Sequence, residues 1–437
     1  MKIAMIGAGS VVFARNLILD ILSFPALRDC TISLMDIDPD RLDLITQLAE
    51  KIVADNNLST VIESTTDREE CLEDADYVIV MIQVGGLDAY KLDLEIPLKY
   101  GVDQCVGDTL GPGGVFRGLR SIPVMIDICS DMEELCPDAL LLNYSNPMAI
   151  NCWAMFTATD IDMVGLCHGV PGTAGEMARM IGAKPEECTY WTAGINHMAW
   201  FLDFRWKGED AYPLLWQNRT PLGVPEAEEK YRLDMLKSYG YFMTESSGHL
   251  SEYIPYYRKR KDLRDLFNNP DFGGESLFYY RMCCEQRDKH YEEIRQQIAG
   301  QKDIPFGRHS GEYASSIIHA LETNEYFRFN GNVENTGLIT NLRDGCCAEV
   351  PCFVDSLGIH PCYVGDLPPH CAALCESNVR VQEMAVEAGI LGDRDMAFSA
   401  VLADPLTAAV CAPHEVRKMV DEMLEAQKEW LPQFEME

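Results

Sequence analysis

The stretch KIAMIGAGSVVFARNLILDIL, residues 2–22, decides the fold at the start of the chain. A short apolar run ends at Gly7, and a helical spacing of apolar residues follows Ser10. Gly7 permits a tight turn, and Gly9 lets the backbone approach a pyrophosphate at the start of the helix. The third glycine of the usual motif is missing, since Phe13 and Ala14 occupy its neighbourhood. A strand, a glycine turn and a helix in this order predict that Gly7, Gly9 and Ser10 bind a dinucleotide.

The second predicted strand ends in an acidic residue, Asp36, within LMDID. A carboxylate at this place hydrogen-bonds the ribose hydroxyls and would repel a 2′-phosphate, so the sequence favours NAD over NADP. Gly85 follows the apolar run VIVMIQV and lets the cofactor pass close to another strand end. We therefore expect NAD to contact Asp36 and Gly85 as well.

One pattern recurs along the first half of the chain: an acidic residue, a burst of β-branched residues or leucine, and a polar turn. It occurs in DADYVIVMIQVGG, DALLLNYSNPM and DMVGLCHGV. Such apolar strands, separated by helices, are typical of a parallel sheet covered on both faces. We predict an α/β fold, with a Rossmann-like doubly wound NAD-binding sheet in residues 1–190. An α+β lobe for substrate binding, catalysis and oligomerisation is expected in residues 191–437, as in lactate and malate dehydrogenases.

The composition restricts the possible partners. A net charge of −33 argues against a nucleic acid or an anionic membrane as a partner. The sequence enters its first predicted strand at once, and it has no apolar stretch long enough to span a bilayer. We expect a cytoplasmic protein, in which the seventeen cysteines stay reduced and serve as core residues or ligands.

Polar residues gather where the predicted strands end, the edge at which ligands bind in such sheets. They come from NYSNPM, CHGV and GINHMAW: Asn143, Asn146, Cys167, His168, Asn196 and His197. A thiolate from Cys167 and an imidazole from His197 suit a divalent metal and leave positions for water or sugar hydroxyls. Their spacing does not establish a site, because isolated Cys and His residues are more often structural.

The chain carries the motifs of one family in order along nearly its whole length. They are IGAGS, LMDID, DTLGPGG with RGLR, NYSNPM, CHGV, GINHMAW and NTGLITNL. The chain therefore resembles family 4 of the glycoside hydrolases, the NAD- and metal-dependent glycosidases that depart from two-carboxylate chemistry. MDIDPDRL, NPMAINCWAM, ESSGHLSEY and WLPQF are most similar to its α-galactosidase (melibiase) branch.

The resemblance implies hydrolysis of unphosphorylated α-glycosides, with α-galactosides as the expected substrate. Bound NAD⁺ would oxidise the sugar C3, after which the C2 proton is removed, the leaving group is eliminated, water adds and the hydride returns. The family implies Mn²⁺, held through Cys167 and His197. One position departs from the α-galactosidase branch, where serine follows the Cys–His pair. Here it is Gly169, which accompanies α-glucosidases and α-glucuronidases.

The resemblance also implies roles for individual residues. The family places an acid-capable side chain directly after the metal cysteine, so His168 is expected to protonate the leaving group. The base that takes the C2 proton is expected within TESSGHLSEYIPYY, where Tyr253 and His249 rank above Glu245.

Further residues are expected to contact the substrate: Asp108, Asn146 and Asn196. Asp108 and Asn146 would touch a sugar hydroxyl or a metal-bound water. In an alternative interpretation, Asp108 only braces the LGPGG turn, and Arg117 and Arg120 pair with it rather than with substrate.

Three alternatives remain at this point: an α-glucosidase or α-glucuronidase of the same family, a net NAD-dependent dehydrogenase, and a non-catalytic NAD sensor. The sensor would be insensitive to replacement of Cys167. The family also implies a homodimer or homotetramer.

Overall fold

The computed structural model describes residues 1–11, 13–217, 229–267 and 274–434. Six parallel strands, in the order β3-β2-β1-β4-β5-β6, build one half of a thirteen-stranded sheet. They are β1 (Lys2–Ile6), β2 (Thr31–Met35), β3 (Val61–Thr65), β4 (Tyr77–Val80), β5 (Leu140–Asn143) and β6 (Met163–Leu166). This strand order confirms the predicted doubly wound sheet.

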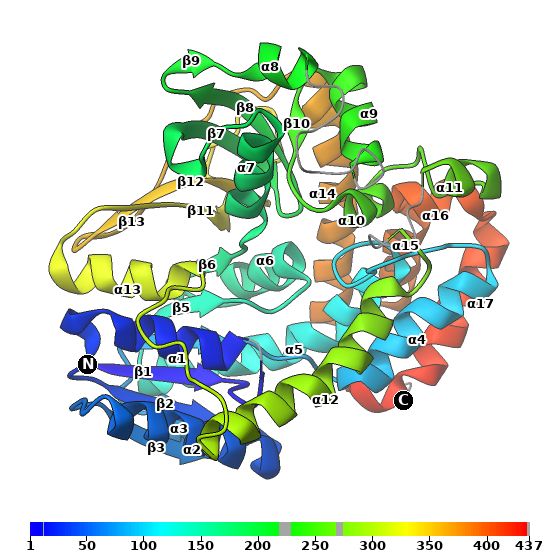
Figure 1. Cartoon of the computed structure of the whole chain (residues 1–437). Coiled ribbons are helices and arrows are strands. Elements are labelled where there is room, and N and C mark those ends of the chain that lie inside the picture. The colour runs from blue at the N-terminus through cyan, green and yellow to red at the C-terminus, as the bar shows by residue number, and fades with distance from the viewer. Residues whose placement is uncertain (12, 218–228, 268–273, 435–437) are drawn as a thin grey trace.

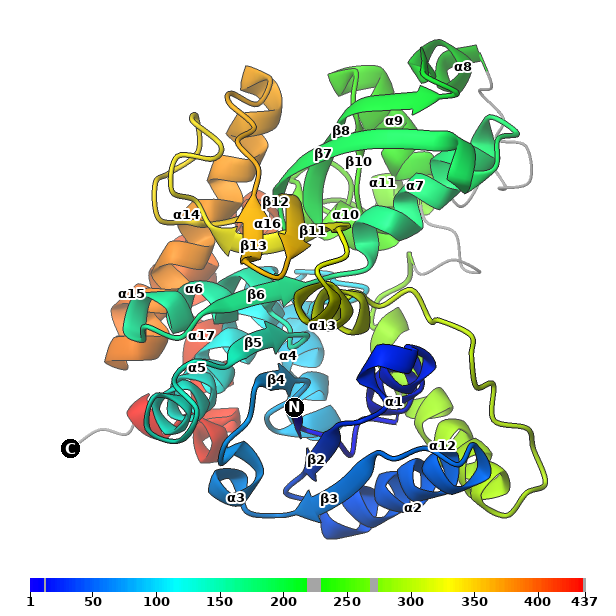
Figure 2. The same cartoon turned by 90° about the vertical axis from the view of Figure 1, so that its left-hand side faces the viewer.

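Helices cover both faces of this parallel half. They are α1 (Phe13–Ser23), α2 (Pro39–Asp55), α3 (Arg68–Leu72), α4 (Gly86–Lys99), α5 (Gly111–Leu135) and α6 (Met148–Ala158). The next helix, α7 (Gly169–Met180), packs instead on the strands within residues 188–206. Helices α1 and α2 lie on one side of strands β2 and β3, and α3 and α5 lie on the other (Figure 2). Because both faces are covered, β1 and β4 are buried along almost their whole length, which explains their continuous apolar sequences.

The second half of the chain is α+β, as predicted, but its strands extend the same sheet (Figure 1). These strands are β7 (Cys188–Ile195), β8 (Met198–Trp206), β9 (Glu209–Asp210), β10 (Phe242–Met243), β11 (Phe327–Glu334), β12 (Cys347–Asp355) and β13 (Gly358–Pro361). β11 pairs antiparallel with β6, and β12 then joins β11 to β7. The single sheet crosses the predicted division at residue 190, and that division stays a prediction.

Helices from the second half pack against both parts of the molecule. They are α8 (Tyr212–Gln217), α9 (Lys230–Tyr239), α10 (Ser247–Tyr253), α11 (Lys261–Phe267), α12 (Phe278–Ile298), α13 (Tyr313–Thr323), α14 (Pro369–Leu391), α15 (Arg394–Ala403), α16 (Pro405–Val410) and α17 (Pro413–Ala426). α12 packs on α2, and α14 packs on α5 and α6. The apolar stripe of α17 is buried, and one main core contains residues from both halves.

Two further expectations concern cysteines and membranes. All seventeen cysteines are free thiols, and most are buried, as expected for core residues. Among the described residues, no helix combines the length and the apolar character needed to cross a bilayer.

Candidate active site

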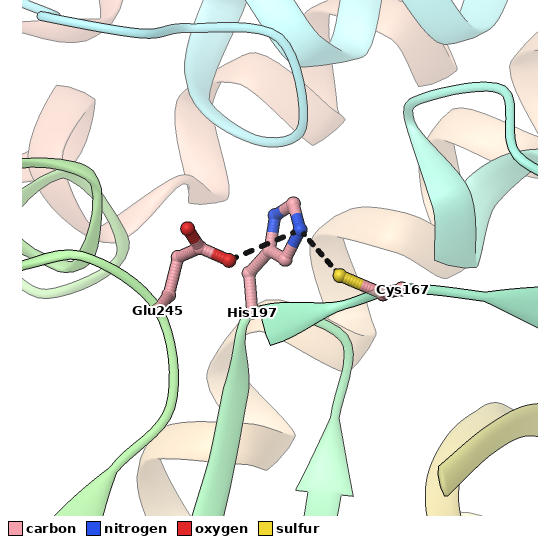
Figure 3. Close-up of side chains that lie close together, drawn as sticks. All are labelled: Cys167, His197 and Glu245. Carbon is pink, nitrogen blue, oxygen red and sulfur yellow. Dashed lines mark hydrogen bonds and ion pairs between the residues drawn. The ribbon is translucent and has the colours of Figure 1, made fainter. Parts of the chain in front are cut away.

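Three potential metal ligands meet where β6 ends. Cys167 directly follows β6, His197 lies in the two-residue turn between β7 and β8, and Glu245 lies between β10 and α10 (Figure 3). The His197 Nε2 atom is 3.3 Å from Cys167 Sγ and 3.3 Å from Glu245 Oε2. One ligand atom from each residue lies within 4.8 Å of the other two. The structure therefore brings together the two residues predicted as ligands and adds Glu245 to them.

Two of these three residues have a backbone conformation that is uncommon outside glycine. His197 has φ +62° and Glu245 has φ +75°. In this region the β-carbon crowds the backbone, so a residue other than glycine is strained, and such residues concentrate at functional sites. The surrounding sheet and α10 hold both turns in place. In this arrangement His197 Nε2 contacts both Cys167 Sγ and Glu245 Oε2 (Figure 3).

The donor set fits a divalent cation. It offers a sulfur, a nitrogen and an oxygen, and the charge around it is negative. Burial, followed by the nearby Glu349 and Glu245, raises the pKa of the Cys167 thiol well above its usual range. A cation at this point would stabilise the thiolate that a metal needs as ligand. The amide oxygen of Asn196 is buried there without a hydrogen-bond partner among the described residues, and it offers a further acceptor.

The second ring nitrogen of His197 is held by two hydroxyl groups. Its Nδ1 lies 3.0 Å from the Tyr253 hydroxyl and 3.2 Å from Thr109 Oγ1. Partners of this kind fix the orientation of a ligating imidazole and leave the other nitrogen free for the metal. Burial lowers the pKa of His197, which keeps the ring neutral as a ligand must be. Burial also raises the pKa of Tyr253 well above its usual value.

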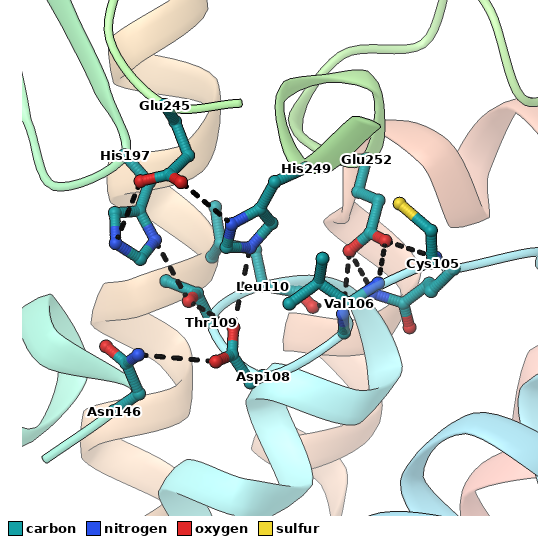
Figure 4. A network of polar contacts seen from close by, with 12 residues as sticks. Cys105, Val106, Asp108, Thr109, Leu110, Asn146, His197, Glu245, His249 and Glu252 are labelled. Carbon is teal, nitrogen blue, oxygen red and sulfur yellow. Dashed lines mark hydrogen bonds and ion pairs between the residues drawn. The ribbon is translucent and has the colours of Figure 1, made fainter. Parts of the chain in front are cut away.

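A polar network surrounds His249 on the other side of Glu245 (Figure 4). His249 Nε2 lies 3.4 Å from Asp108 Oδ1, and its Nδ1 lies 3.6 Å from Glu245 Oε1. Asn146 donates to Asp108 Oδ2 at 3.3 Å. Burial disfavours the charged imidazolium, but Asp108 and Glu245 outweigh it and raise the pKa of His249 to about 10. The predicted residues Asp108, Asn146, His249 and Tyr253 thus lie in one group with the ligands.

The loop that carries Asp108 and Thr109 is fixed by Glu252. The Glu252 carboxylate accepts hydrogen bonds from the backbone amides of Cys105, Val106 (2.6 Å) and Gly107 (2.9 Å) (Figure 4). Glu252 lies on α10, one residue before Tyr253. Neither Thr109 nor Glu252 was singled out from the sequence, because only the packing of α10 against this loop reveals them.

His168 lies at the outer side of the cluster. Its side chain is 66% exposed, and its Nδ1 lies 3.2 Å from Glu312 Oε1. The hydrogen bond with Glu312 is the main reason why the pKa of His168 is raised, although burial opposes it. An imidazole held at one nitrogen and open to solvent has the other nitrogen available for a leaving group.

The residues predicted to bind the cofactor form a separate group at the ends of β1 and β2. Gly7 has φ +87°, and a β-carbon on it would lie 2.9 Å from the Met81 carbonyl oxygen. Gly9 donates its backbone amide to Asp36 Oδ2 at 2.8 Å, and the Ser10 amide donates to the Gly7 carbonyl at 3.0 Å. The tight turn predicted from the sequence is therefore present, with Asp36 beside it.

Gly85, the remaining cofactor prediction, immediately precedes α4 with φ +72°. A β-carbon on Gly85 would lie 3.1 Å from the ring of Trp430, so the C-terminal segment covers one side of this glycine. Asn143 is buried and donates to the Ser145 carbonyl at 3.2 Å, so it shapes the turn after β5.

Gly169 leaves room for the third ligand. A β-carbon on Gly169 would lie 3.0 Å from Glu245 Oε2 and 3.4 Å from Cys167 Sγ. The departure from serine noted in the sequence therefore concerns a residue in contact with the ligand group.

Comparisons with known proteins bear on the family. Residues 2–183 match the family described as "Family 4 glycosyl hydrolase", and residues 192–407 match its C-terminal domain. An α-galactosidase of Rhizobium meliloti (strain 1021) is 45% identical over 99% of this chain and 89% of its own length. An α-galactosidase of Bacillus subtilis (strain 168) is 40% identical over 99% of both chains.

A solved structure has the same fold. It is a 6-phospho-α-glucosidase from gut microorganisms in complex with NAD and Mn²⁺, 24% identical, with a TM-score of 0.82 over 99% of both chains. Two family matches that together cover most of the chain establish the assignment suggested by its motifs. The chain belongs to glycosyl hydrolase family 4.

Proposed function

We propose that this protein hydrolyses unphosphorylated α-galactosides with the help of NAD and a divalent cation, Mn²⁺. The observation that carries the proposal is the cluster of Cys167, His197 and Glu245, in a chain that is similar over nearly its full length to two α-galactosidases. The resemblance implies Asn or Asp after the metal cysteine in members of the family that act on phosphorylated sugars. His168 at this position therefore supports an unphosphorylated substrate.

Two groups of residues would hold the cofactors. Cys167, His197 and Glu245 provide the ligands for the cation, and the turn from Gly7 to Ser10, with Asp36 and Gly85, provides the NAD site. When bound, NAD supplies a hydride acceptor that can return the hydride, and the cation supplies a Lewis acid for the sugar oxygens.

The side chains around the cluster handle the protons. Tyr253 is the proposed base for the C2 proton in its phenolate form, which a nearby bound cation would favour. Its hydroxyl oxygen lies 3.0 Å from His197 Nδ1 and 3.4 Å from His249 Nε2. His249, itself the other base candidate, would stabilise that phenolate with its charged ring. His168 would donate a proton to the glycosidic oxygen, with Glu312 orienting its ring. Asp108, Asn146 and Asn196 would bind sugar hydroxyls.

The organisation of the protein follows from the same proposal. Residues 1–190 would bind NAD, and residues 191–437 would complete the substrate site and form a homodimer or homotetramer. Free thiols throughout the chain suit a cytoplasmic enzyme, because Cys167 must stay reduced to bind metal. Light scattering on the purified protein would give the number of subunits.

The decisive experiment is a panel of aryl α-galactosides, α-glucosides and α-glucuronides, assayed with NAD⁺, Mn²⁺ and a reducing agent. We expect the α-galactoside to be cleaved fastest and no NADH to accumulate. Deuterium at the sugar C2 should slow the reaction, because the bond to that hydrogen breaks. Cleavage at full rate after complete removal of NAD and divalent ions would refute the proposal. Faster cleavage of the glucoside would instead assign Gly169 to α-glucoside specificity.

A further inference from the structure

Arg117 is a buried guanidinium beside the proposed sugar site. It lies on α5, and only 8% of its surface is exposed. Its Nε donates to the Asn146 carbonyl oxygen at 3.1 Å, and its guanidinium carbon lies 5.4 Å from the centre of the Tyr90 ring. These two contacts fix the direction of the side chain. Asn146 itself donates to Asp108, so Arg117 adjoins the network around His249.

Arg120, one turn further along α5, shows what a structural arginine looks like in this fold. Its two terminal nitrogens donate to the Asp93 carboxylate at 2.8 and 2.6 Å, and Gln427 adds another bond. Arg117 has no such partner: within the described ranges, its terminal nitrogens have neither an ion pair nor a hydrogen bond. An arginine stays charged at any ordinary pH, and the contact with the Tyr90 ring leaves its terminal nitrogens free to donate. These nitrogens are therefore available to an added acceptor.

Asn146 connects Asp108 to Arg117, and these two charged residues form no ion pair with each other among the described residues. Arg117 donates to the Asn146 carbonyl oxygen, and the Asn146 side-chain amide donates to Asp108 Oδ2. Burial opposes the charge of Asp108, but His249 and then Arg117 lower the pKa of the carboxyl. The Asp108 carboxylate bonds instead to Thr109, His249 and Asn146. A hydrogen-bond donor and an acceptor thus border the same region without bonding to each other. A sugar hydroxyl is both a donor and an acceptor, so it fits between them.

We propose that Arg117 is a specificity-determining residue. Its terminal nitrogens donate to a hydroxyl oxygen of the bound glycone, and the same hydroxyl group donates a hydrogen bond to the Asp108 carboxylate. The assignment rests on the proposed function, since it requires the glycone to bind beside the cluster of Cys167, His197 and Glu245. It makes Arg117 a contact for a hydroxyl group of the glycone, which can accept from the guanidinium and donate to the carboxylate.

The test combines two changes, one in the protein and one in the sugar. Inhibition constants of galactose and of its 2-, 3-, 4- and 6-deoxy forms are measured against aryl α-galactoside hydrolysis for the wild type, Arg117→Met and Arg117→Lys. We expect Arg117→Met to weaken galactose binding by about tenfold to about 100-fold, the effect of one charge-assisted hydrogen bond. The wild type should lose a similar amount with one deoxy sugar, and the variant should bind that sugar no worse than galactose. Arg117→Lys should fall between the two, since it keeps the charge without the planar fork.

Controls separate this contact from a structural role. Arg205, an exposed residue of β8 paired with Asp203, gives the variant Arg205→Met with the same charge change outside the site. NAD affinity and the melting temperature show whether each variant is folded. If Arg117→Met unfolds, galactose and its deoxy forms are compared in Arg117→Lys instead.

The outcomes distinguish failure of the Arg117 assignment from failure of the proposed function. Equal losses for every sugar, or an unchanged Arg117→Met, would overturn the assignment while leaving the proposed function intact. A wild type that neither binds nor cleaves galactosides would overturn the proposed function and this assignment together.

Discussion

Two regions use the same backbone conformation with different residues. They are the turn from Gly7 to Ser10, called here the cofactor turn, and the group of Cys167, His197 and Glu245, called here the ligand cluster. Both need backbone with positive φ at the end of a strand. At the cofactor turn the residue is Gly7, which adopts this conformation at little cost and presents no side chain. At the cluster the residues are His197 and Glu245, which keep their side chains in spite of the strain. The chain accepts backbone strain where a side chain is needed to bind, and it avoids that strain where the amide group suffices.

This comparison predicts that the two regions fail separately. The largest effect is expected from Cys167→Ser, because it removes the sulfur that completes the ligand set. We expect kcat/KM to fall by at least about 1,000-fold and Mn²⁺ affinity to drop, while NAD affinity is unchanged. Titration with Mn²⁺, followed by electron paramagnetic resonance, gives the metal affinity. Quenching of the tryptophan fluorescence of the protein by added NAD gives the NAD affinity. Cys362→Ser, at a half-buried thiol outside the cluster, is the matched control. Normal activity in Cys167→Ser would contradict the metal site.

The reverse phenotype is expected from Gly9→Ala. A β-carbon on Gly9 would lie 2.7 Å from Asp36 Oδ2 and 2.8 Å from the β-carbon of Arg41, so the turn and the carboxylate must separate. We expect NAD affinity to fall by about tenfold to about 100-fold, as for an overpacked site, with Mn²⁺ affinity retained. Gly172→Ala is the control, because no atom lies within 4 Å of the added carbon. An equal loss of both ligands in Gly9→Ala would mean that the two regions are one cooperative unit.

A smaller effect is expected where the cluster depends on a neighbouring loop. Glu252→Gln leaves a single side-chain oxygen to accept the hydrogen bonds from the backbone amides of residues 105–107, which the two carboxylate oxygens now share. We expect the free energy of unfolding to fall by about 1–3 kcal/mol and kcat/KM by about tenfold, since Asp108 and Thr109 lose their fixed position. Urea unfolding and steady-state kinetics would measure both. Glu134→Gln, on the exposed side of α5, should be neutral. A stable variant with unchanged kinetics would show that the loop holds its position without Glu252.

The smallest effect is expected from Gly169→Ala. Its β-carbon would approach Glu245 Oε2 to 3.0 Å, which the carboxylate can relieve by a shift of a few tenths of an ångström. We expect Mn²⁺ affinity to fall by less than about tenfold, with NAD affinity unchanged. The Mn²⁺ titration used for Cys167→Ser measures it, again with Gly172→Ala for comparison. Loss of the metal altogether would show that Glu245 has no freedom to move.

Much of this arrangement could be predicted from the sequence because it depends on strand ends. The glycine turn with Asp36 follows once the strands are placed. The pairing of Cys167 with His197 was implied by the resemblance to the family, since β11 and β12 lie between β6 and β7 in the sheet. Strand β3 was not predicted because it lies at the edge of the sheet and is largely exposed. Its sequence therefore has no continuous apolar run. Glu245 was expected as a possible base rather than a ligand, and Thr109 and Glu252 were not foreseen. All three act through contacts between segments that are distant in sequence, which no local pattern encodes.

The strand order has a consequence for protein synthesis. β7 and β8, which carry His197 on their connecting turn, reach the parallel strands only through β12 and β11. A nascent chain that has left the ribosome up to the β7–β8 hairpin can already fold its nucleotide-binding strands and pack α7 on the hairpin. The two strands that join the hairpin to the parallel sheet are still missing at that point. The enzyme therefore gains its catalytic ability late in translation, after residue 355 has emerged.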